Sequence, residues 1–392
     1  MPPARRGKRG KKAPMESAGS SIDALPDGVL QHILGFLPAW DAVRTCVLAR
    51  RWRDLWMFAT GLRIIGNDDD DLEGLRESVD HLLLTRGIAP LETCELRFDG
   101  IADEFSDGDV IRVNLWFRHA IRCQVRVLLL LLTQQSQHFD LHDLHLVSRH
   151  LMELELVGVQ HWKLAADDCD SSLVKRIISK SLKRLSITAC VFSESFHTHI
   201  HSPSLVSLLL DDNWYNTPVL ESIPSLVDAS IRVVDRSVDS CEDCDSGDCN
   251  SCNGIIHDNS NCILLEGLSK AKNLALIAES KTFIFKMDLK WCPTFSKMKT
   301  LLLSDYWCVA LDLDAITCIL KNSPLLEKLT LELCSKGSDH KMEMKGNYIP
   351  VQETTAISEH LKIIVVKCDV VDEKVYKVLK LLSTCNIRFS FE

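Results

Sequence analysis

The sequence lacks any hydrophobic run long enough to cross a bilayer and any apolar core of a secretory signal. Its longest aliphatic run, Val127–Leu132, is far shorter than the roughly 20 apolar residues of a transmembrane helix. The basic N-terminus leads instead into Ala13–Ser21, which is small and polar. We therefore expect a protein of the nucleus and/or cytoplasm, without a membrane partner, whose sixteen cysteines are mostly reduced.

The sequence also lacks the short motifs that mark common catalytic and phosphate-binding sites. It contains no P-loop, no GxGxxG after a predicted strand, no HExxH and no GxSxG. Asp68–Asp71 lacks the glycine and the terminal glutamate of an EF-hand loop. Many Cys–His pairs can be imagined among sixteen cysteines and fourteen histidines, but no spacing singles out a nucleophile. We expect no catalytic residue and no cofactor.

Positive charge is scarce outside the first dozen residues. The chain has 45 basic and 54 acidic residues, and without the six basic residues of the tail its net charge falls from −9 to −15. Such an acidic body repels phosphate backbones, so we expect no nucleic-acid partner. The tail is either a nuclear-import signal or a solvated segment without a receptor. Its basic residues are Arg5, Arg6, Lys8, Arg9, Lys11 and Lys12.

Residues 22–57 are expected to form three short helices. Pro26 and Asp27 suit a first helical turn, and apolar residues then recur at helical spacing until Pro38 stops the helix. A second helix is expected to begin near Asp41 and a third to cover Arg50–Met57. Three helices in about forty residues make a small core with surplus apolar surface. This pattern is typical of a domain that completes its core on a partner.

The stretch LPDGVLQHILGFLPAWDAVRTCVLARRWRDLW (Leu25–Trp56) resembles an F-box of the plant type, in which LP-D-x-L precedes FLP, DAVRTCVL, RRWR and LW. The resemblance covers nearly the whole motif and implies that the domain binds a Skp-type adaptor and, through it, a cullin. It implies that Leu55 and Trp56 tie the third helix to the following domain. The implied adaptor contacts are Leu25, Pro26, Leu30, Ile33, Leu34, Leu37, Val43, Leu48 and Trp52.

Two positions depart from the commoner form of this motif. Ala49 stands where many members have serine, which removes an N-cap that contributes about 0.5–2 kcal/mol. Gly35 replaces a commoner serine and costs about 1 kcal/mol in helix propensity. Both departures predict a domain that is somewhat unstable on its own.

One pattern, apolar-x-x-apolar-x-apolar, recurs through the rest of the chain. Its ten copies begin at Leu91, Val125, Leu151, Leu182, Leu205, Leu226, Ala271, Met298, Leu326 and Leu361. Successive copies start 21 to 35 residues apart, except for one gap of 45 residues. This recurrence is typical of leucine-rich repeats, in which the last four positions form a short parallel strand. The leucine runs Leu208–Leu210 and Leu301–Leu303 predict strand segments that are fully buried.

The sequence thus predicts an α/β protein, with a three-helix F-box followed by an irregular leucine-rich-repeat solenoid of parallel strands with helical or irregular return segments. We expect a disordered basic tail at 1–20, the F-box at 21–60, and a linker with a first helix at 61–90. The repeats are expected at 91–357, with a Cys/Asp-rich insertion at 237–262. A strand-helix cap at 358–392 resembles the FBD region of some plant F-box/leucine-rich-repeat proteins.

The insertion contains two CxxC pairs that could supply four thiolates to zinc, namely Cys241, Cys244, Cys249 and Cys252. His257 and Cys262 are alternative ligands nearby. Only four residues separate the two pairs, where zinc ribbons use a dozen or more, and the neighbouring carboxylates oppose thiolate formation. These features favour an acidic loop over a zinc site.

Three alternating histidines, His197, His199 and His201, would face one side of a strand and could bind a metal. Ser202 and Pro203 follow at once, however, and predict a loop. This placement argues against a metal site.

Together these observations predict a non-catalytic substrate adaptor of an SCF-type (Skp–cullin–F-box) ubiquitin ligase. The F-box would bind the Skp adaptor and the repeats would hold a substrate protein. Two alternatives stay open: an interaction scaffold that delivers nothing for degradation, and a sensor in which zinc at Cys241–Cys252 gates substrate access. No polar cluster in the sequence indicates a small-molecule co-ligand between the repeats.

Overall fold

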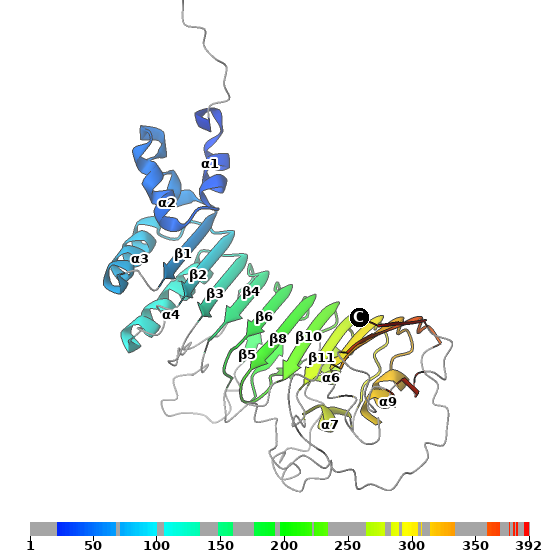
Figure 1. Cartoon of the computed structure of the whole chain (residues 1–392). Coiled ribbons are helices and arrows are strands. Elements are labelled where there is room, and N and C mark those ends of the chain that lie inside the picture. Colours follow the sequence, from blue (N-terminus) through cyan, green and yellow to red (C-terminus); the bar gives the residue numbers. More distant parts are fainter. Residues whose placement is uncertain are drawn as a thin grey trace, which may run out of the picture.

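The chain forms an N-terminal helical region joined to a long, curved array of parallel strands (Figure 1). The computed structural model describes residues 22–67, 71–99, 106–133, 148–159, 176–192, 197–221, 223–233, 264–278, 284–289, 292–304, 307, 314–333, 359–368, 376, 379–380, 382 and 388–391. Every structural statement below concerns these residues.

The N-terminal region contains two α-helices and four short 3-10 helices. They are η1 (Ile22–Ala24), α1 (Asp27–Leu34), α2 (Ala39–Arg44), η2 (Thr45–Val47), η3 (Arg50–Trp52) and η4 (Leu55–Phe58). Prolines at residues 26 and 38 immediately precede α1 and α2, where their missing N–H leaves no helical hydrogen bond unmade. The third predicted helix is two 3-10 helices instead, and Ala49 makes no side-chain cap in front of them.

Twelve of the described strands form one parallel sheet, in the order β1-β2-β3-β4-β6-β8-β10-β11-β12-β13-β14-β15. Its strands are β1 (Gly61–Asn67), β2 (Thr93–Asp99), β3 (Val127–Thr133), β4 (Glu153–Val157), β6 (Arg184–Thr188), β8 (Ser207–Asn213), β10 (Asp228–Val233), β11 (Asn273–Ala278), β12 (Thr300–Ser304), β13 (Lys328–Glu332), β14 (Ile363–Lys367) and β15 (Arg388–Phe391). A second parallel sheet contains β5 (Arg176–Ile178), β7 (His199–His201) and β9 (Val219–Leu220).

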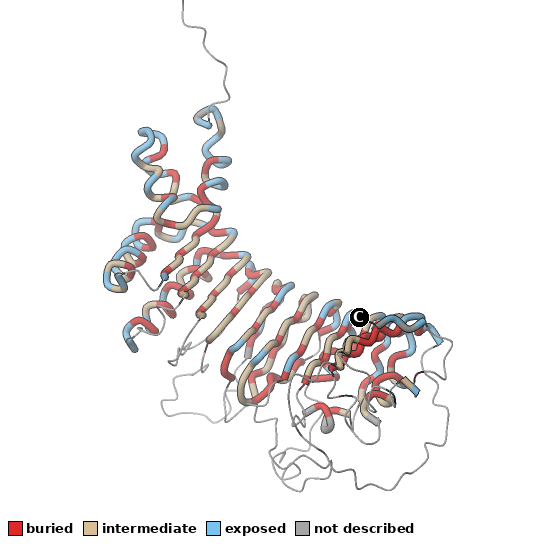
Figure 2. The backbone as a smooth tube through the Cα atoms, in the orientation of Figure 1, coloured by how far each residue is buried: buried red, intermediate tan, exposed pale blue. Residues whose placement is uncertain are grey.

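The strands pair in a register that stacks the inward side chains of successive repeats. Leu130, Leu156, Ile187 and Leu210 are register partners on four neighbouring strands, and each is at most 2% exposed. Buried and less buried residues alternate along strands such as β2, β3 and β4, as Figure 2 shows. Because successive side chains of a strand point to opposite faces, one face of the sheet carries the core and the other stays open.

Helices cover the core face of the sheet between strands. They are α3 (Leu72–Arg86), α4 (Asp107–Arg122), α6 (Leu265–Leu268), α7 (Ile284–Leu289) and α9 (Asp314–Lys321), and each contributes buried side chains to the same core as the strands. None of the helices in the described ranges is both long and apolar enough to traverse a bilayer.

The prediction of an F-box-like helical region followed by a parallel-strand solenoid is confirmed, and all ten recurrent patterns lead into strands of the large sheet. The structure also contains elements that the sequence analysis did not predict. Residues 61–67, expected to be linker, form the edge strand β1, and the three-stranded sheet was not foreseen. The prediction of fully buried leucine runs is wrong at Leu209 and Leu302, which lie on the open face and are half-buried.

The helical region meets the first strand through two glycines that lie almost in contact. A Cβ atom added to Gly35 would lie 2.5 Å from the backbone nitrogen of Gly61, and one added to Gly61 would lie 2.3 Å from the carbonyl oxygen of Gly35. The backbone nitrogen of Thr60 also donates to the carbonyl of Gln31 (3.3 Å). Gly35 is therefore a requirement of this junction, although in the sequence it reads only as a weak point of the helix.

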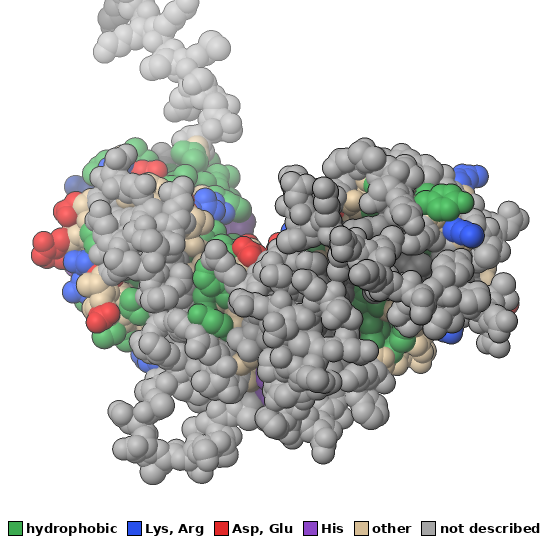
Figure 3. Space-filling model, turned by 60° about the horizontal axis from the view of Figure 1, so that its bottom comes forward, with side chains coloured by type: hydrophobic (Ala, Val, Ile, Leu, Met, Phe, Trp, Pro, Cys, Tyr) green, Lys and Arg blue, Asp and Glu red, His purple; other side chains and the backbone are tan. Residues whose placement is uncertain are grey.

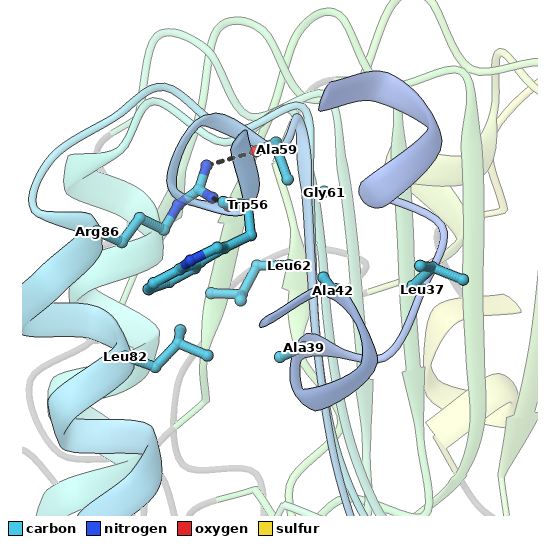
Figure 4. A pocket seen from close by; sticks show the side chains of 9 residues that line it. All are labelled: Leu37, Ala39, Ala42, Trp56, Ala59, Gly61, Leu62, Leu82 and Arg86. Carbon is cyan, nitrogen blue, oxygen red and sulfur yellow. Dashed lines mark hydrogen bonds between the residues drawn. The ribbon is translucent and has the colours of Figure 1, made fainter. Parts of the chain in front are cut away.

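A buried arginine holds the other side of the junction. Arg86, in the last turn of α3, is 6% exposed and donates from its guanidinium to the carbonyl of Ala59 (2.6 Å). It also donates to the carbonyls of Trp56 and Pro90, both at 3.4 Å. Burial lowers the pKa of this guanidinium below its ordinary value. Its side chain lines a small cavity between the helical region and the solenoid, together with Trp56 and Leu62 (Figure 4).

Helices α3 and α4 are joined by an ion pair that also caps α4. The carboxylate of Asp109 accepts from Arg76 of α3 and from the backbone nitrogen and hydroxyl of Ser106 (2.8 and 2.6 Å). Burial alone would raise the pKa of Asp109, but these hydrogen bonds outweigh it and hold the pKa below its usual value. A second contact runs from the indole nitrogen of Trp116 to Asp80 (2.7 Å).

Replacing Ile187 with alanine should lower the free energy of unfolding by about 2–5 kcal/mol, because it leaves a cavity between Leu156 and Leu210. Ser186→Ala, one residue away on the open face, should change it by no more than about 0.5 kcal/mol. Urea denaturation followed by circular dichroism measures both. Equal losses for the two variants would contradict the assignment of the two faces.

Gly35→Ala should destabilise the junction by about 1–3 kcal/mol, because the added methyl group meets backbone that cannot move aside. Gly28→Ala is the matched control, since its Cβ has no neighbour within 4 Å and alanine favours a helix by about 1 kcal/mol. Thermal denaturation should therefore show opposite changes in melting temperature for the same substitution near the start of α1 and at its C-cap. A stable Gly35→Ala protein would show that the close approach is not needed.

The contribution of Asp109 to stability should disappear in acid. A carboxyl group whose pKa is lower in the folded than in the unfolded state stabilises the protein above the unfolded pKa, and this stabilisation is lost as pH falls through the folded pKa. Wild type should exceed Asp109→Asn in melting temperature at neutral pH, and the difference should shrink below about pH 4. Melting curves at several pH values test this, and a difference that does not depend on pH would contradict it.

Candidate functional site

The largest concentration of exposed apolar side chains lies on the N-terminal helical region. Among the described residues, seven of the fifteen exposed large hydrophobic side chains belong to residues 22–58. Figure 3 shows hydrophobic side chains at this end of the molecule, where the described chain begins. The seven are Ile22, Val29, Ile33, Phe36, Val47, Leu48 and Phe58. Exposed apolar side chains gathered in one region of a protein are typical of a surface that binds another protein.

Helix α1 is apolar on two sides. Leu30 and Leu34, one turn apart, are 0% and 1% exposed and pack in the small core of the helical region. Val29 and Ile33, also one turn apart, are 44% and 36% exposed on the adjoining side, and Phe36 continues this row just beyond the helix at 59%. One side of α1 therefore holds the domain together, and the other is open to a partner.

A second exposed pair follows α2. Val47 and Leu48 are 83% and 67% exposed. They lie at the end of η2, where the fold itself does not require apolar side chains. We call Val29, Ile33 and Phe36 the α1 patch and Val47 with Leu48 the η2 patch. Fully burying one such side chain contributes about 1.5–3 kcal/mol. Covering both patches would therefore contribute substantially to the free energy of binding a partner.

The start of α1 is held in place by Arg51 of η3. Its guanidinium donates to the carboxylate of Asp27 (2.7 Å) and to the carbonyl oxygen of Leu25 (2.5 Å). Asp27 lies in the first turn of α1, where a carboxylate also offsets the positive end of the helix dipole. These hydrogen bonds hold the α1 patch in one orientation relative to η3.

The structure places the nine residues of the implied adaptor contact in three environments. Buried in the chain are Leu30, Leu34 and Trp52. Half-buried are Leu25, Leu37 and Val43. Exposed are Pro26, Ile33 and Leu48. Contact with a partner stays a prediction for all nine, but the chain itself already supplies packing neighbours to the three buried residues.

Sequence reasoning assigned no partner role to Val29, Phe36 and Val47, which are among the most exposed apolar residues of the region. The spacing of residues 29, 33 and 36 was available as a signal, since these positions recur at the period of a helix. What the spacing did not show is which side of α1 packs on the domain's own core. Of the two residues expected to tie the region to the solenoid, Trp56 packs against both cores, whereas Leu55 lies in the small core alone.

Several candidate groups of the sequence analysis lie outside the described residues, including the four cysteines Cys241–Cys252 and the basic residues Arg5–Lys12. Within the described ranges, no group of three or more His, Cys, Asp or Glu side chains could hold a metal ion. The loop expected around the histidines is wrong, because His199 and His201 belong to β7. Both contact Glu221, at 3.2 and 2.9 Å, whereas His197 bonds to the carbonyl of Thr217 (2.7 Å).

The buried thiols of the described core are poor nucleophiles. Burial raises the pKa of Cys94 and of Cys190 to about 12, and both side chains are at most 1% exposed. Burial and the neighbouring Cys318 also raise the pKa of Cys292 to about 12. A thiol must ionise to attack or to bind a metal, so these three serve as small core residues.

Comparison with known proteins points to the same region of the chain. Residues 22–57 match the F-box domain. A 208-residue segment, 52% of this chain, is 29% identical to an F-box/LRR-repeat protein of Arabidopsis thaliana and covers 40% of that protein. An FBD-associated F-box protein of the same plant is 36% identical over 99 residues, which are 25% of this chain and 22% of the relative.

A longer alignment reaches into the repeats. An F-box/FBD/LRR-repeat protein of Arabidopsis thaliana is 26% identical over 298 residues, 65% of this chain and 62% of the relative. The chain thus spans less than two thirds of the length of each of these relatives. The helical region is the part that carries the domain match, and the parallel sheet is the repeat part. The chain therefore contains an F-box domain, and it is a distant homologue of F-box/LRR and FBD-associated F-box proteins of Arabidopsis thaliana.

Proposed function

We propose that this protein is a substrate-recognition adaptor of an SCF-type ubiquitin ligase. The α1 and η2 patches bind a Skp-type adaptor, which links the chain to a cullin, and the solenoid holds a substrate protein. The observation that carries the proposal is that the F-box match at residues 22–57 coincides with the largest concentration of exposed apolar side chains in the described part of the chain. The chain itself catalyses no reaction in this proposal.

The mechanism requires proximity and a fixed geometry. Holding a substrate next to a ubiquitin-charged enzyme raises the effective concentration of its lysines at the thioester. The advantage is greatest when the two binding surfaces cannot swing freely relative to each other. The junction supports this requirement, because the backbones of Gly35 and Gly61 approach too closely to admit a side chain and Arg86 joins α3 to the carbonyl of Ala59.

Binding of a Skp-type adaptor tests the proposal. Ile33→Glu and Leu48→Glu each place a charge in an exposed apolar patch, and each should weaken binding by roughly a hundredfold or more. Leu115→Glu is the matched control, because Leu115 is 55% exposed on α4, away from both patches, and its substitution should leave binding unchanged. Calorimetric titration of purified full-length proteins measures the affinities, with circular dichroism as a check of folding.

The wild-type chain, the adaptor and a cullin should also elute together from gel filtration as a three-component complex. Failure of the folded wild-type chain to bind the adaptor would end the proposal. An equal loss of adaptor affinity in Leu115→Glu and Ile33→Glu would show that the patches are not the binding surface.

A further inference from the structure

The open face of the sheet is not uniform, and its most apolar stretch lies on β3. This strand is apolar on both faces: Leu128, Leu130 and Leu132 are buried in the core, whereas Val127, Leu129 and Leu131 are half-buried on the open face. Only the inward residues are needed for the stacking of repeats. The outward residues expose aliphatic surface that the fold itself does not use.

Within the described chain, the charged residues on the neighbouring strands have ion-pair or hydrogen-bond partners, with one exception. Asp99, at the end of β2, accepts a hydrogen bond from the hydroxyl of Thr133 (2.6 Å). On β2, Glu95 contacts Arg97 (2.7 Å) and Arg63 (3.6 Å), and on β4 Glu153 accepts from Arg184 (2.5 Å). Glu155, also on β4, has no hydrogen bond or ion pair anywhere in the described chain. This half-buried carboxylate therefore remains available to pair with a cation of a binding partner.

The register places Glu155 beside the apolar stretch. Glu155 pairs with Leu129 of β3 and with Ser186 of β6, and Val157 pairs with Leu131. Neighbouring strands lie about 5 Å apart, and alternate residues of one strand about 7 Å apart. Leu129, Leu131, Val157 and Glu155 therefore form one surface, which we call the β3–β4 surface, and its place in the N-terminal half of the sheet is visible in Figure 1.

We infer that the β3–β4 surface binds a basic, aliphatic segment of a partner protein. Two apolar side chains of the segment cover Leu129 and Leu131, and a lysine or arginine nearby pairs with Glu155. An acidic segment or a phosphate backbone would instead meet an uncompensated carboxylate. This inference rests on the proposed function, because it names the chemistry of the substrate that the solenoid would present.

Selection from a library of random peptides displayed on phage tests the inference with the full-length protein. Peptides enriched on wild type should combine a lysine or arginine with two aliphatic residues within about two positions of it. Glu155→Lys should weaken the binding of synthetic copies roughly tenfold or more, measured by fluorescence anisotropy. Leu129→Glu should abolish binding.

The matched control is Glu332→Gln, because Glu332 lies on the same face but is already paired with Lys367 (3.1 Å). This variant should bind the peptides like wild type. Enriched peptides without basic residues, equal binding to Glu155→Lys, or no enrichment above the Leu129→Glu protein would each overturn the inference. The same preparations are also titrated with the Skp-type adaptor, so that the two tests can be told apart. If the wild-type chain binds peptides but no adaptor, the proposed function is refuted and the peptide-binding surface is not.

Discussion

The structure depends on the stacking of inward aliphatic side chains between neighbouring strands. A strand of five to seven residues turns only two or three side chains inward, and it cannot bury them without the strands on either side. The in-register series Leu130, Leu156, Ile187 and Leu210 shows the principle. Backbone hydrogen bonds between parallel strands hold this register, so the spacing of the apolar residues and the pairing of the backbone require each other.

An array built in this way needs cover for its first strand. The F-box provides it, with the backbones of Gly35 and Gly61 close together and Trp56 packing against the cores of both parts. The same contacts give the F-box one orientation relative to the solenoid. In the adaptor role that we propose, this orientation would set where a bound substrate lies relative to the rest of a ligase.

The many cysteines have a structural explanation in the described part of the chain. Cys94 occupies an inward strand position in register with Leu128, and Cys123 and Cys190 are completely buried. The described cysteines form no disulfides, and burial keeps the most deeply enclosed thiols protonated. Thiols in such positions act as small hydrophobic groups, so a high cysteine count is compatible with a protein that holds its partners by surface contacts alone.

The helical F-box and the parallel repeats could be predicted from the sequence, because the spacing of apolar residues directly reflects which side chains must be buried together. It did not reveal β1, since a strand beginning at Gly61 with only Leu62 and Ile64 inward lacks the full repeat pattern. It also did not show which side of α1 faces solvent, because helical periodicity marks an apolar arc but not which part of that arc the rest of the chain covers. Three properties emerged only from the folded chain: Leu34 is core and Ile33 surface, the backbone of Gly61 requires a glycine at position 35, and Glu155, beside Leu129, has no partner among the described residues. Each of these properties arises from contacts between residues far apart in the chain, which local sequence patterns do not encode.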